Sequence, residues 1–297
     1  MMNTATTRKP LTVAAVQMSS QQDVRANLAT IKAAIRDARA QGAQLVVLPE
    51  NCCSMGRQFA LAERFDELSA TLAGYARESG IYLLAGTLPC AYRPDGSTIA
   101  DGRLRQVSQL FAPDGKMVAR YDKIHLFTAT VADKQGSYNE AATFEPGEQT
   151  LVAPIEMNNS VYHLGMMVCF DLRFPALAQR LRQAGADMLS APAAFTYLTG
   201  QAHWSLLLQA RALDSQCLVI GAAQGGTHYY KDDMVRETWG HTAITDFNGK
   251  IIGSYDDSEL LGTAADAQYA LVLANLDTPA QWQARQSMPI FDCHRLA

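Results

Sequence analysis

The chain has 297 residues, of which 48% are hydrophobic and 18% are charged, and its net charge is −4. This length and composition suit one large globular domain or two smaller ones, and the charge gives no reason to expect nucleic acid or an anionic membrane as a partner. No apolar run is long enough to span a bilayer, and residues 1–10 lack the pattern of a signal peptide, so we expect neither feature.

The six cysteines are scattered along the chain and form no CxxC pair. Cys52 and Cys53 are adjacent, and adjacent cysteines rarely form a structural disulfide. The cysteine pattern therefore predicts free thiols and a cytoplasmic location.

The first half of the chain alternates between strand-like and helix-like patterns. The predicted elements, in chain order, are a strand at Leu11–Ser19, a helix at Val24–Gln41, a strand at Ala43–Leu48, a helix at Phe59–Ser79, a strand at Ile81–Leu88 and a hairpin over Leu104–Tyr121. Asp114-Gly115 is the predicted hairpin turn. The sequence from Lys123 to Pro146 is irregular, and a loop of this length suggests a function.

The second half continues the same alternation. Its predicted elements are strands at Thr150–Ala153 and Val161–Val168, a helix at Phe174–Ala184, a strand at Asp187–Ala191, a helix at His203–Ser215, a strand at Cys217–Ala223, a hairpin around Asn248-Gly249, a strand at Ala270–Leu276 and a helix at Thr278–Ser287. No repeat, low-complexity tract or linker divides the chain. We therefore predict one α/β domain over residues 1–297, with two mixed sheets packed face to face between two layers of helices.

One stretch combines a buried strand, a sharp turn and a helix start. The apolar run before Cys169 ends at this cysteine, and a helix is predicted to begin near Pro175. A thiolate is favoured near a helix N-terminus and near a cation, so Cys169 is a candidate nucleophile. The alternative is a packed, inert core thiol, and this stretch alone does not decide between the two.

Two further polar residues end or follow strand-like runs. Glu50 ends the run that includes Leu45–Leu48, and Lys123 follows the first predicted hairpin. In α/β sheets, ligand sites gather beyond the carboxyl ends of strands. A thiol, a carboxylate and an ammonium at such a place could supply a nucleophile, a proton carrier and an oxyanion partner for acyl transfer. A surface carboxylate and a solvated loop lysine are the plain alternatives, because spacing alone does not bring the three together.

The three segments resemble a known family. Leu-Pro-Glu50, Tyr-Asp-Lys123-Ile-His-Leu and Val-Cys169-Phe-Asp-Leu-Arg-Phe-Pro are similar to the Glu, Lys and Cys motifs of the nitrilase superfamily, and they occur in the same order. The resemblance extends from about residue 11 to residue 294. It implies a four-layer α-β-β-α sandwich, a Glu50–Lys123–Cys169 triad, no cofactor, and a homodimer or higher homo-oligomer.

The resemblance also assigns supporting residues. The family's second glutamate, which supports the lysine and orients the substrate, falls on Glu140. Many relatives have tyrosine where this chain has Phe170, but the backbone N–H at this position is the expected oxyanion donor, so the change matters little. Arg173 is a candidate for binding a substrate anion, and an ion pair with a nearby carboxylate is its alternative.

The segment from Ala194 to Trp204, which contains Phe195 and His203, is similar to a motif of the Nit branch. That branch contains omega-amidases and deaminated glutathione amidases, and two later segments, 210–217 and 222–228, look more like the latter. The segment Thr227–Thr238 is longer than usual and borders the expected pocket. The resemblance therefore implies a cysteine amidase for a small carboxylate-bearing amide, with deaminated glutathione as the favoured substrate.

Several alternatives stay open at this stage. The protein could be an omega-amidase for 2-oxoglutaramate, another amidase, a nitrilase, a carbamoylase or a binding member of the fold without turnover. His203, His228 and His241 could suggest a zinc site or a papain-like base for Cys169, but none has metal-ligand spacing, so we expect no metal. We predict instead that His203 is a structural histidine at a helix start that supports the site. Nucleotide binding has no support, because neither a P-loop nor a G-x-G-x-x-G motif after a strand is present.

Overall fold

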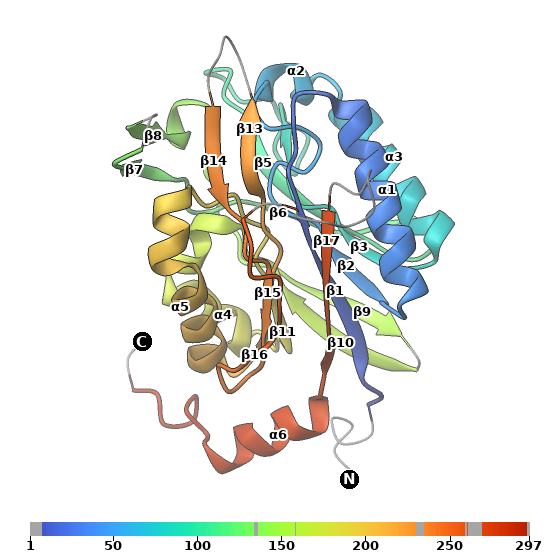
Figure 1. Ribbon diagram of the computed structural model, residues 1–297. Coiled ribbons are helices and arrows are strands. Elements are labelled where there is room, and N and C mark those ends of the chain that lie inside the picture. Colours follow the sequence, from blue (N-terminus) through green and yellow to red (C-terminus); the bar gives the residue numbers. More distant parts are fainter. Residues whose placement is uncertain are drawn as a thin grey trace.

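Two mixed β-sheets lie face to face between two layers of helices (Figure 1). The computed structural model describes residues 8–133, 136–157, 159–229, 235–258, 260 and 269–295. The seven-stranded sheet has the order β17 (Tyr269–Leu276), β1 (Leu11–Met18), β2 (Leu45–Val47), β3 (Tyr82–Leu84), β5 (Arg105–Phe111) and β4 (Leu88–Cys90), with β6 (Met117–Asp122) also paired to β5. The six-stranded sheet has the order β16 (Ile251–Ser254), β15 (Ala243–Thr245), β12 (Leu218–Gly221), β11 (Met188–Ser190), β10 (Ser160–Gly165) and β9 (Val152–Met157).

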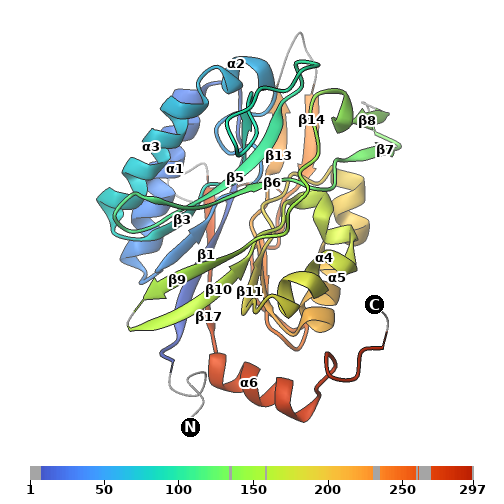
Figure 2. The ribbon, with the colours of Figure 1, turned by 180° about the vertical axis from the view of Figure 1, so that it is seen from behind.

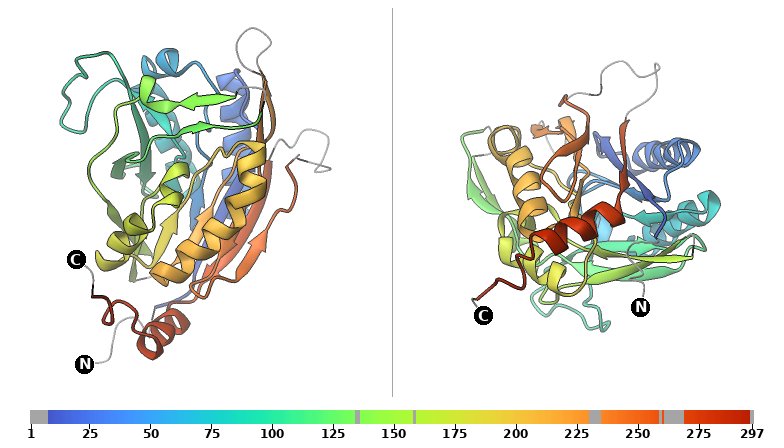
Figure 3. Two further views of the ribbon diagram at one scale, coloured as in Figure 1. Left: turned by 90° about the vertical axis from the view of Figure 1, so that its left-hand side faces the viewer. Right: turned by 90° about the horizontal axis from the view of Figure 1, so that it is seen from below.

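The helices cover the outer faces of the two sheets. Helices α1 (Val24–Ala40) and α3 (Phe65–Ser79) pack on the seven-stranded sheet, and α4 (Pro175–Gln183) and α5 (Tyr197–Ser215) pack on the other. The view from below in Figure 3 shows this layering, with α6 (Thr278–Ser287) crossing the end of the sandwich. The predicted α-β-β-α arrangement is confirmed.

The alternation of side chains along the strands explains this layering. In β1, Leu11, Val13 and Ala15 face the second sheet, whereas Val16 and Met18 face α1 and α3. Successive strand side chains point to opposite faces, so a strand with apolar residues at every position is buried on both sides. The parallel pairs β1–β2 and β10–β11 then point their carboxyl ends toward the same region of the molecule (Figure 2).

Strong local signals gave correct predictions. Helix α1 begins after Asp23, whose side chain accepts hydrogen bonds from two backbone N–H groups of the first turn, as expected of an N-cap. Helix α4 begins at Pro175, and proline is favoured at the first helical position. The hairpins at Asp114-Gly115 and Asn248-Gly249 are both present, with Gly115 and Gly249 at positive φ.

Two predicted elements are each divided in the structure. The helix predicted at Phe59–Ser79 consists of α2 (Gln58–Ala62) and α3, because α2 packs on β4 whereas α3 packs on α1 and β3. The strand predicted at Ile81–Leu88 ends early, as β3, and a second strand, β4, begins at Leu88. Between them Gly86 has φ +50, and a Cβ there would lie 2.0 Å from the Pro49 carbonyl oxygen, so the strand turns at this glycine.

Three further segments differ from their predictions. Helix α5 begins at Tyr197 rather than His203, because its first turns pack on β14 (Val235–Trp239), where Gly200 lies against Trp239. The segment Thr227–Thr238 belongs to a hairpin of β13 (Gly225–Tyr229) and β14, with residues 230–234 outside the described residues. The irregular segment 123–146 contains β7 (Thr128–Thr130), β8 (Ser137–Asn139) and the 3-10 helix η2 (Glu140–Ala142).

Candidate active site

Cys169 lies at a sharp turn beyond the carboxyl end of β10. It begins the 3-10 helix η3 (Cys169–Arg173), and its φ of 49° lies in the left-handed region, which is costly for a residue other than glycine. Its N–H donates to the Pro192 carbonyl at 2.8 Å. The N–H groups in the first turn of a helix have no partner within the helix. Because Cys169 begins η3, its thiol lies at the end of the helix where these N–H groups are.

The surroundings of Cys169 favour its neutral form. Burial raises the pKa of the Cys169 thiol well above its ordinary value, and the Glu50 carboxylate raises it further. Lys123 and a hydrogen bond from the Ala194 backbone oppose this shift without overcoming it. The cation expected from the sequence is present and lowers the pKa of the thiol, but the desolvation of the buried sulfur is the larger effect.

Lys123 is buried between two carboxylates. Its Nζ lies 2.8 Å from Glu50 Oε1 and 2.9 and 2.8 Å from the two oxygens of Glu140. Burial alone would lower the pKa of Lys123, but Glu140, Glu50 and Cys169 together raise it above its ordinary value. The plain alternative of a solvated loop lysine is wrong, because Lys123 is 2% exposed.

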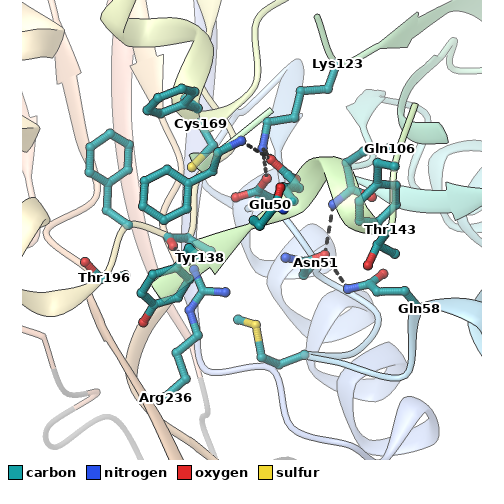
Figure 4. Close-up of a pocket in the computed structure, with 18 of the residues that line it drawn as sticks. Glu50, Asn51, Gln58, Gln106, Lys123, Tyr138, Thr143, Cys169, Thr196 and Arg236 are labelled. Carbon is teal, nitrogen blue, oxygen red and sulfur yellow. Dashed lines mark hydrogen bonds and ion pairs between the residues drawn. The ribbon is translucent and has the colours of Figure 1, made fainter. Parts of the chain in front are cut away.

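Glu50, Lys123 and Cys169 come from three different strand ends and lie together in the structure (Figure 4). Glu50 follows β2 and Lys123 follows β6, both in the seven-stranded sheet, whereas Cys169 follows β10 in the other sheet. Glu140 comes from η2, in the segment that sequence analysis described as an irregular loop. The Phe127 N–H donates to Glu140 Oε2 at 2.6 Å, which orients this carboxylate toward the lysine. The site therefore lies where the ends of the two sheets meet.

A buried aspartate links the cysteine turn to the lysine segment. Asp171 Oδ2 accepts hydrogen bonds from the Tyr121 hydroxyl at 2.7 Å and the Val168 N–H at 2.9 Å. Asp171 Oδ1 accepts from the His125 N–H at 3.0 Å and lies 2.7 Å from His125 Nδ1. Sequence analysis did not identify this role, although Asp171 lies within the cysteine motif that it quoted.

A cavity of about 310 Å³ opens beside the triad. Phe170, Arg173 and Phe195 line it together with Glu50, Lys123, Glu140 and Cys169. Arg173 is half-buried over the Phe170 and Phe195 rings, and no carboxylate of the described residues lies within 4.0 Å of it. Arg173 therefore forms no ion pair with any of the described residues, in contrast to the alternative considered for it from the sequence.

His203 does not line the cavity. It is exposed on α5, beyond the first turn, and its Nδ1 lies 3.3 Å from the Arg173 guanidinium. The prediction of a structural histidine at a helix start is wrong, because the helix begins at Tyr197. Among the described residues, the hydrogen-bonding contact of His203 with the cavity wall is the one to Arg173.

The cavity contains further polar side chains that sequence analysis missed. Asn51 Oδ1 accepts hydrogen bonds from Gln58 Nε2 at 3.3 Å and Gln106 Nε2 at 3.0 Å, which forms an amide cluster on one wall. Arg236 of β14 enters from another side. The available signals were the position of Asn51 beside Glu50 and the proximity of segment Thr227–Thr238 to the expected pocket.

Neither a metal site nor a membrane span is found in the part of the chain that the structure describes. There, no three His, Cys, Asp or Glu side chains are grouped so that they could hold a metal ion, and no helix is long and apolar enough to cross a bilayer. His203, His228 and His241 are absent from the residues lining the cavity. All six cysteines are free.

Comparison with known proteins identifies the family. Residues 12–271 match the sequence model of the carbon-nitrogen hydrolase family. The chain is 37% identical over 292 residues to a deaminated glutathione amidase of Yersinia enterocolitica, covering 97% of this chain and 94% of the relative. It is 32% identical over 262 residues to the human omega-amidase NIT2, covering 86% and 85% of the two chains.

A solved structure agrees with these sequence matches. Nit3 of Saccharomyces cerevisiae, described as a member of branch 10 of the nitrilase superfamily, superposes with a TM-score of 0.73 at 27% identity and covers 95% of both chains. The chain therefore belongs to the carbon-nitrogen hydrolase family of enzymes, in the Nit branch of the nitrilase superfamily.

Proposed function

We propose that the protein is a cysteine amidase in which Cys169 is the nucleophile, Glu50 carries protons and Lys123 stabilises the oxyanion. The observation that carries this proposal is the buried ammonium of Lys123, which is held by Glu50 and Glu140 at the wall of the cavity that contains Cys169. A buried amine fixed by two carboxylates is a preorganised positive charge, and such charges stabilise a developing oxyanion with little reorganisation.

The first half of the reaction forms a thioester. Glu50 takes the proton from Cys169 Sγ, and the sulfur attacks the amide carbonyl carbon. Lys123 Nζ and the Phe170 N–H stabilise the tetrahedral oxyanion. The C–N bond then breaks, and the leaving amine receives the proton from Glu50. The raised pKa of Cys169 fits this order, because a neutral resting thiol needs a base next to it.

The second half releases the acid. Glu50 takes a proton from a water molecule, whose oxygen attacks the thioester carbonyl. The C–S bond breaks, and the Cys169 sulfur regains its proton from Glu50. Glu140 keeps Lys123 in place through both halves, since its two oxygens both accept hydrogen bonds from Nζ.

We propose deaminated glutathione as the substrate, hydrolysed to 2-oxoglutarate and cysteinylglycine. The 37% identity to the Yersinia enterocolitica deaminated glutathione amidase supports this choice. Arg173 supports it too, because this cation lines the cavity with no carboxylate of the described residues within 4.0 Å and suits a carboxylate of the substrate. The 32% identity to human omega-amidase NIT2 favours 2-oxoglutaramate as a second candidate. The ratio of kcat/KM for the two compounds separates the two activities.

The chemistry can be tested with thiol variants. Cys169→Ala should abolish turnover of both compounds, whereas Cys217→Ala, which removes a buried thiol outside the cavity, should keep it. Glu50→Gln should lower kcat by about 10²–10⁴-fold, as expected for loss of a general acid–base group. The measurements are steady-state rates and circular dichroism of each variant. Substantial activity of folded Cys169→Ala would refute the mechanism.

A further inference from the structure

Arg236 reaches the active-site cavity from the hairpin of β13 and β14. Its Nη2 donates to the Ala194 carbonyl at 2.6 Å, and its guanidinium carbon lies 5.6 Å from the centre of the Tyr138 ring. Ala194 is the residue whose backbone also forms a hydrogen bond with Cys169. In Figure 4 the Arg236 side chain extends from the hairpin into the cavity. Two contacts therefore hold the guanidinium in a defined place close to the triad.

The charge of Arg236 has no compensating anion in the described residues. No carboxylate there lies within 4.0 Å of it, and its buried Nε has no hydrogen-bond partner among them. The carboxylates of the cavity wall, Glu50 and Glu140, are both bound to Lys123. A partly buried guanidinium presents a planar set of donors that matches a carboxylate. Among the described residues, the guanidinium of Arg236 is therefore left without an anionic partner and could bind an anion that enters with the substrate.

Arg236 also marks the boundary between the active-site cavity and an outer one. Arg236 and Tyr138 line both cavities. The outer cavity of about 430 Å³ is also lined by Tyr197, Leu198, Asp133 and Glu237, and neither of these two carboxylates lies within 4.0 Å of the Arg236 guanidinium nitrogens. Arg173, by contrast, lies on the same short helix as Cys169 and lines only the inner cavity. A substrate whose acyl part lies beside Arg173 in the active-site cavity would have its amine part on the side of Arg236.

We propose that Arg236 is a specificity-determining residue that binds a carboxylate on the leaving-group side of the scissile amide. This inference rests on the proposed amidase function. It defines the substrate class as an amide with one carboxylate on the acyl part, close to Arg173, and another on the amine part. An amide of ammonia has no carboxylate on its leaving group, so Arg236 would contribute nothing specific to its binding.

The sharpest test uses two substrates that differ in one carboxylate. The pair is deaminated glutathione and its analogue in which the C-terminal carboxylate is a carboxamide. The wild-type enzyme should prefer deaminated glutathione over its C-terminal carboxamide by about 10–100-fold in kcat/KM, the range for loss of a hydrogen bond to a charged group. Arg236→Gln should reduce this preference to about threefold or less, mainly through KM, because the contact is remote from the reacting bond.

Arg182→Gln is the matched control. Arg182 is also partly buried and packs on an aromatic ring, Phe291, with no carboxylate of the described residues within 4.0 Å, but it lies outside the cavity. This variant should keep the wild-type preference. The role of Arg236 is refuted if Arg236→Gln keeps the preference or lowers both rates equally. If wild type hydrolyses neither compound nor 2-oxoglutaramate, the proposed function itself fails.

Discussion

Asp171 receives hydrogen bonds from the segment that carries Cys169 and from the segment that carries Lys123. Val168 precedes Cys169, the proposed nucleophile, whereas Tyr121 and His125 lie on either side of Lys123 in the sequence. Because the carboxylate is fully buried, its acceptor capacity is used by the protein alone. We infer that Asp171 is a positioning residue that sets the distance between the cysteine turn and the lysine without touching the substrate.

Asp171→Asn tests this role, because it keeps the shape of the side chain but replaces one acceptor oxygen with a donor. One backbone donor, the N–H of Val168 or that of His125, would then face an N–H group, and a buried unsatisfied group costs about 1–3 kcal/mol. We expect lower stability and a fall in kcat of about 10²-fold with a smaller change in KM, because small displacements at a reacting centre have effects of this size.

Asp187→Asn is the control for a general effect of losing a buried carboxylate. Asp187 also accepts hydrogen bonds, from Arg8 and the His163 N–H, but it lies outside the cavity. It should lose stability with nearly unchanged kcat. Equal losses of kcat in the two variants, measured at a temperature where both are folded, would exclude a positioning role for Asp171.

The sequence identified Glu50, Lys123 and Cys169, which the structure brings to one cavity, but not their surroundings. These three residues lie in short motifs at the ends of strand-like runs, so the local sequence was sufficient to select them. Arg236 could not be found in this way, because it reaches the cavity through the pairing of β13 with β14 and the packing of α5 on β14. Its role depends on tertiary contacts that a local pattern does not contain.

At the scale of elements, Gly86 fixes the path of the chain beside Glu50. Its φ is +50, and a Cβ there would lie 2.0 Å from the Pro49 carbonyl oxygen, immediately before Glu50. Periodicity predicted one continuous strand through this position, because apolar residues continue across it. The close approach of two backbone segments requires glycine here and ends β3.

Gly86→Ala should therefore displace the segment that carries Glu50. We expect a fall in kcat of about 10-fold or more together with a loss of stability. Gly80→Ala is the matched control, because Gly80 also has positive φ (+62) but nothing lies within 4 Å of the position that a Cβ would take there. It should cost only about 1–2 kcal/mol of conformational strain and leave kcat unchanged.

Steady-state rates and urea unfolding of the two glycine variants separate these effects. If Gly86→Ala retained wild-type kcat, the path of the chain at Pro49 would not depend on the absence of a side chain at position 86. A decrease in kcat for Gly80→Ala of the same size would point to a general effect of strain instead.

At the scale of the whole molecule, the alternation of strands and helices predicted the four layers correctly. Apolar residues on both faces of β1 and β2 require one covering layer of helices and one of strands. The hairpins β7–β8 and β13–β14 were not predicted, because their partly exposed residues do not show a clear period-two pattern. These hairpins carry residues of the cavity wall, so the shape of the site was less predictable than the core.

His228 joins one of these hairpins to the chain after β1. It is fully buried, with Nδ1 2.8 Å from the Ser20 carbonyl oxygen and Nε2 2.6 Å from Thr238 Oγ1. A carbonyl can only accept, so Nδ1 carries the proton and Nε2 is the acceptor of the neutral ring. Burial, assisted by the charge of Arg236 and opposed by the hydrogen bond to Ser20, lowers the pKa of His228 to about 4.

This shift makes the stability of the protein depend on pH. An unfolded chain binds a proton at His228 below its ordinary pKa of 6.5, whereas the folded chain binds it only below about 4. The contribution of the neutral ring is therefore fully present above pH 6.5, is lost as pH falls toward 4, and changes no further below that value. The difference between the two pKa values corresponds to about 3 kcal/mol of unfolding free energy.

Urea unfolding at pH values of about 7, 5.5 and 4.5 measures this contribution of His228. The free energy of wild type minus that of His228→Gln should fall across this range, whereas the difference from His294→Gln, which changes an exposed ring, should stay constant. Parallel curves for wild type and His228→Gln would mean that His228 keeps its ordinary pKa in the folded protein.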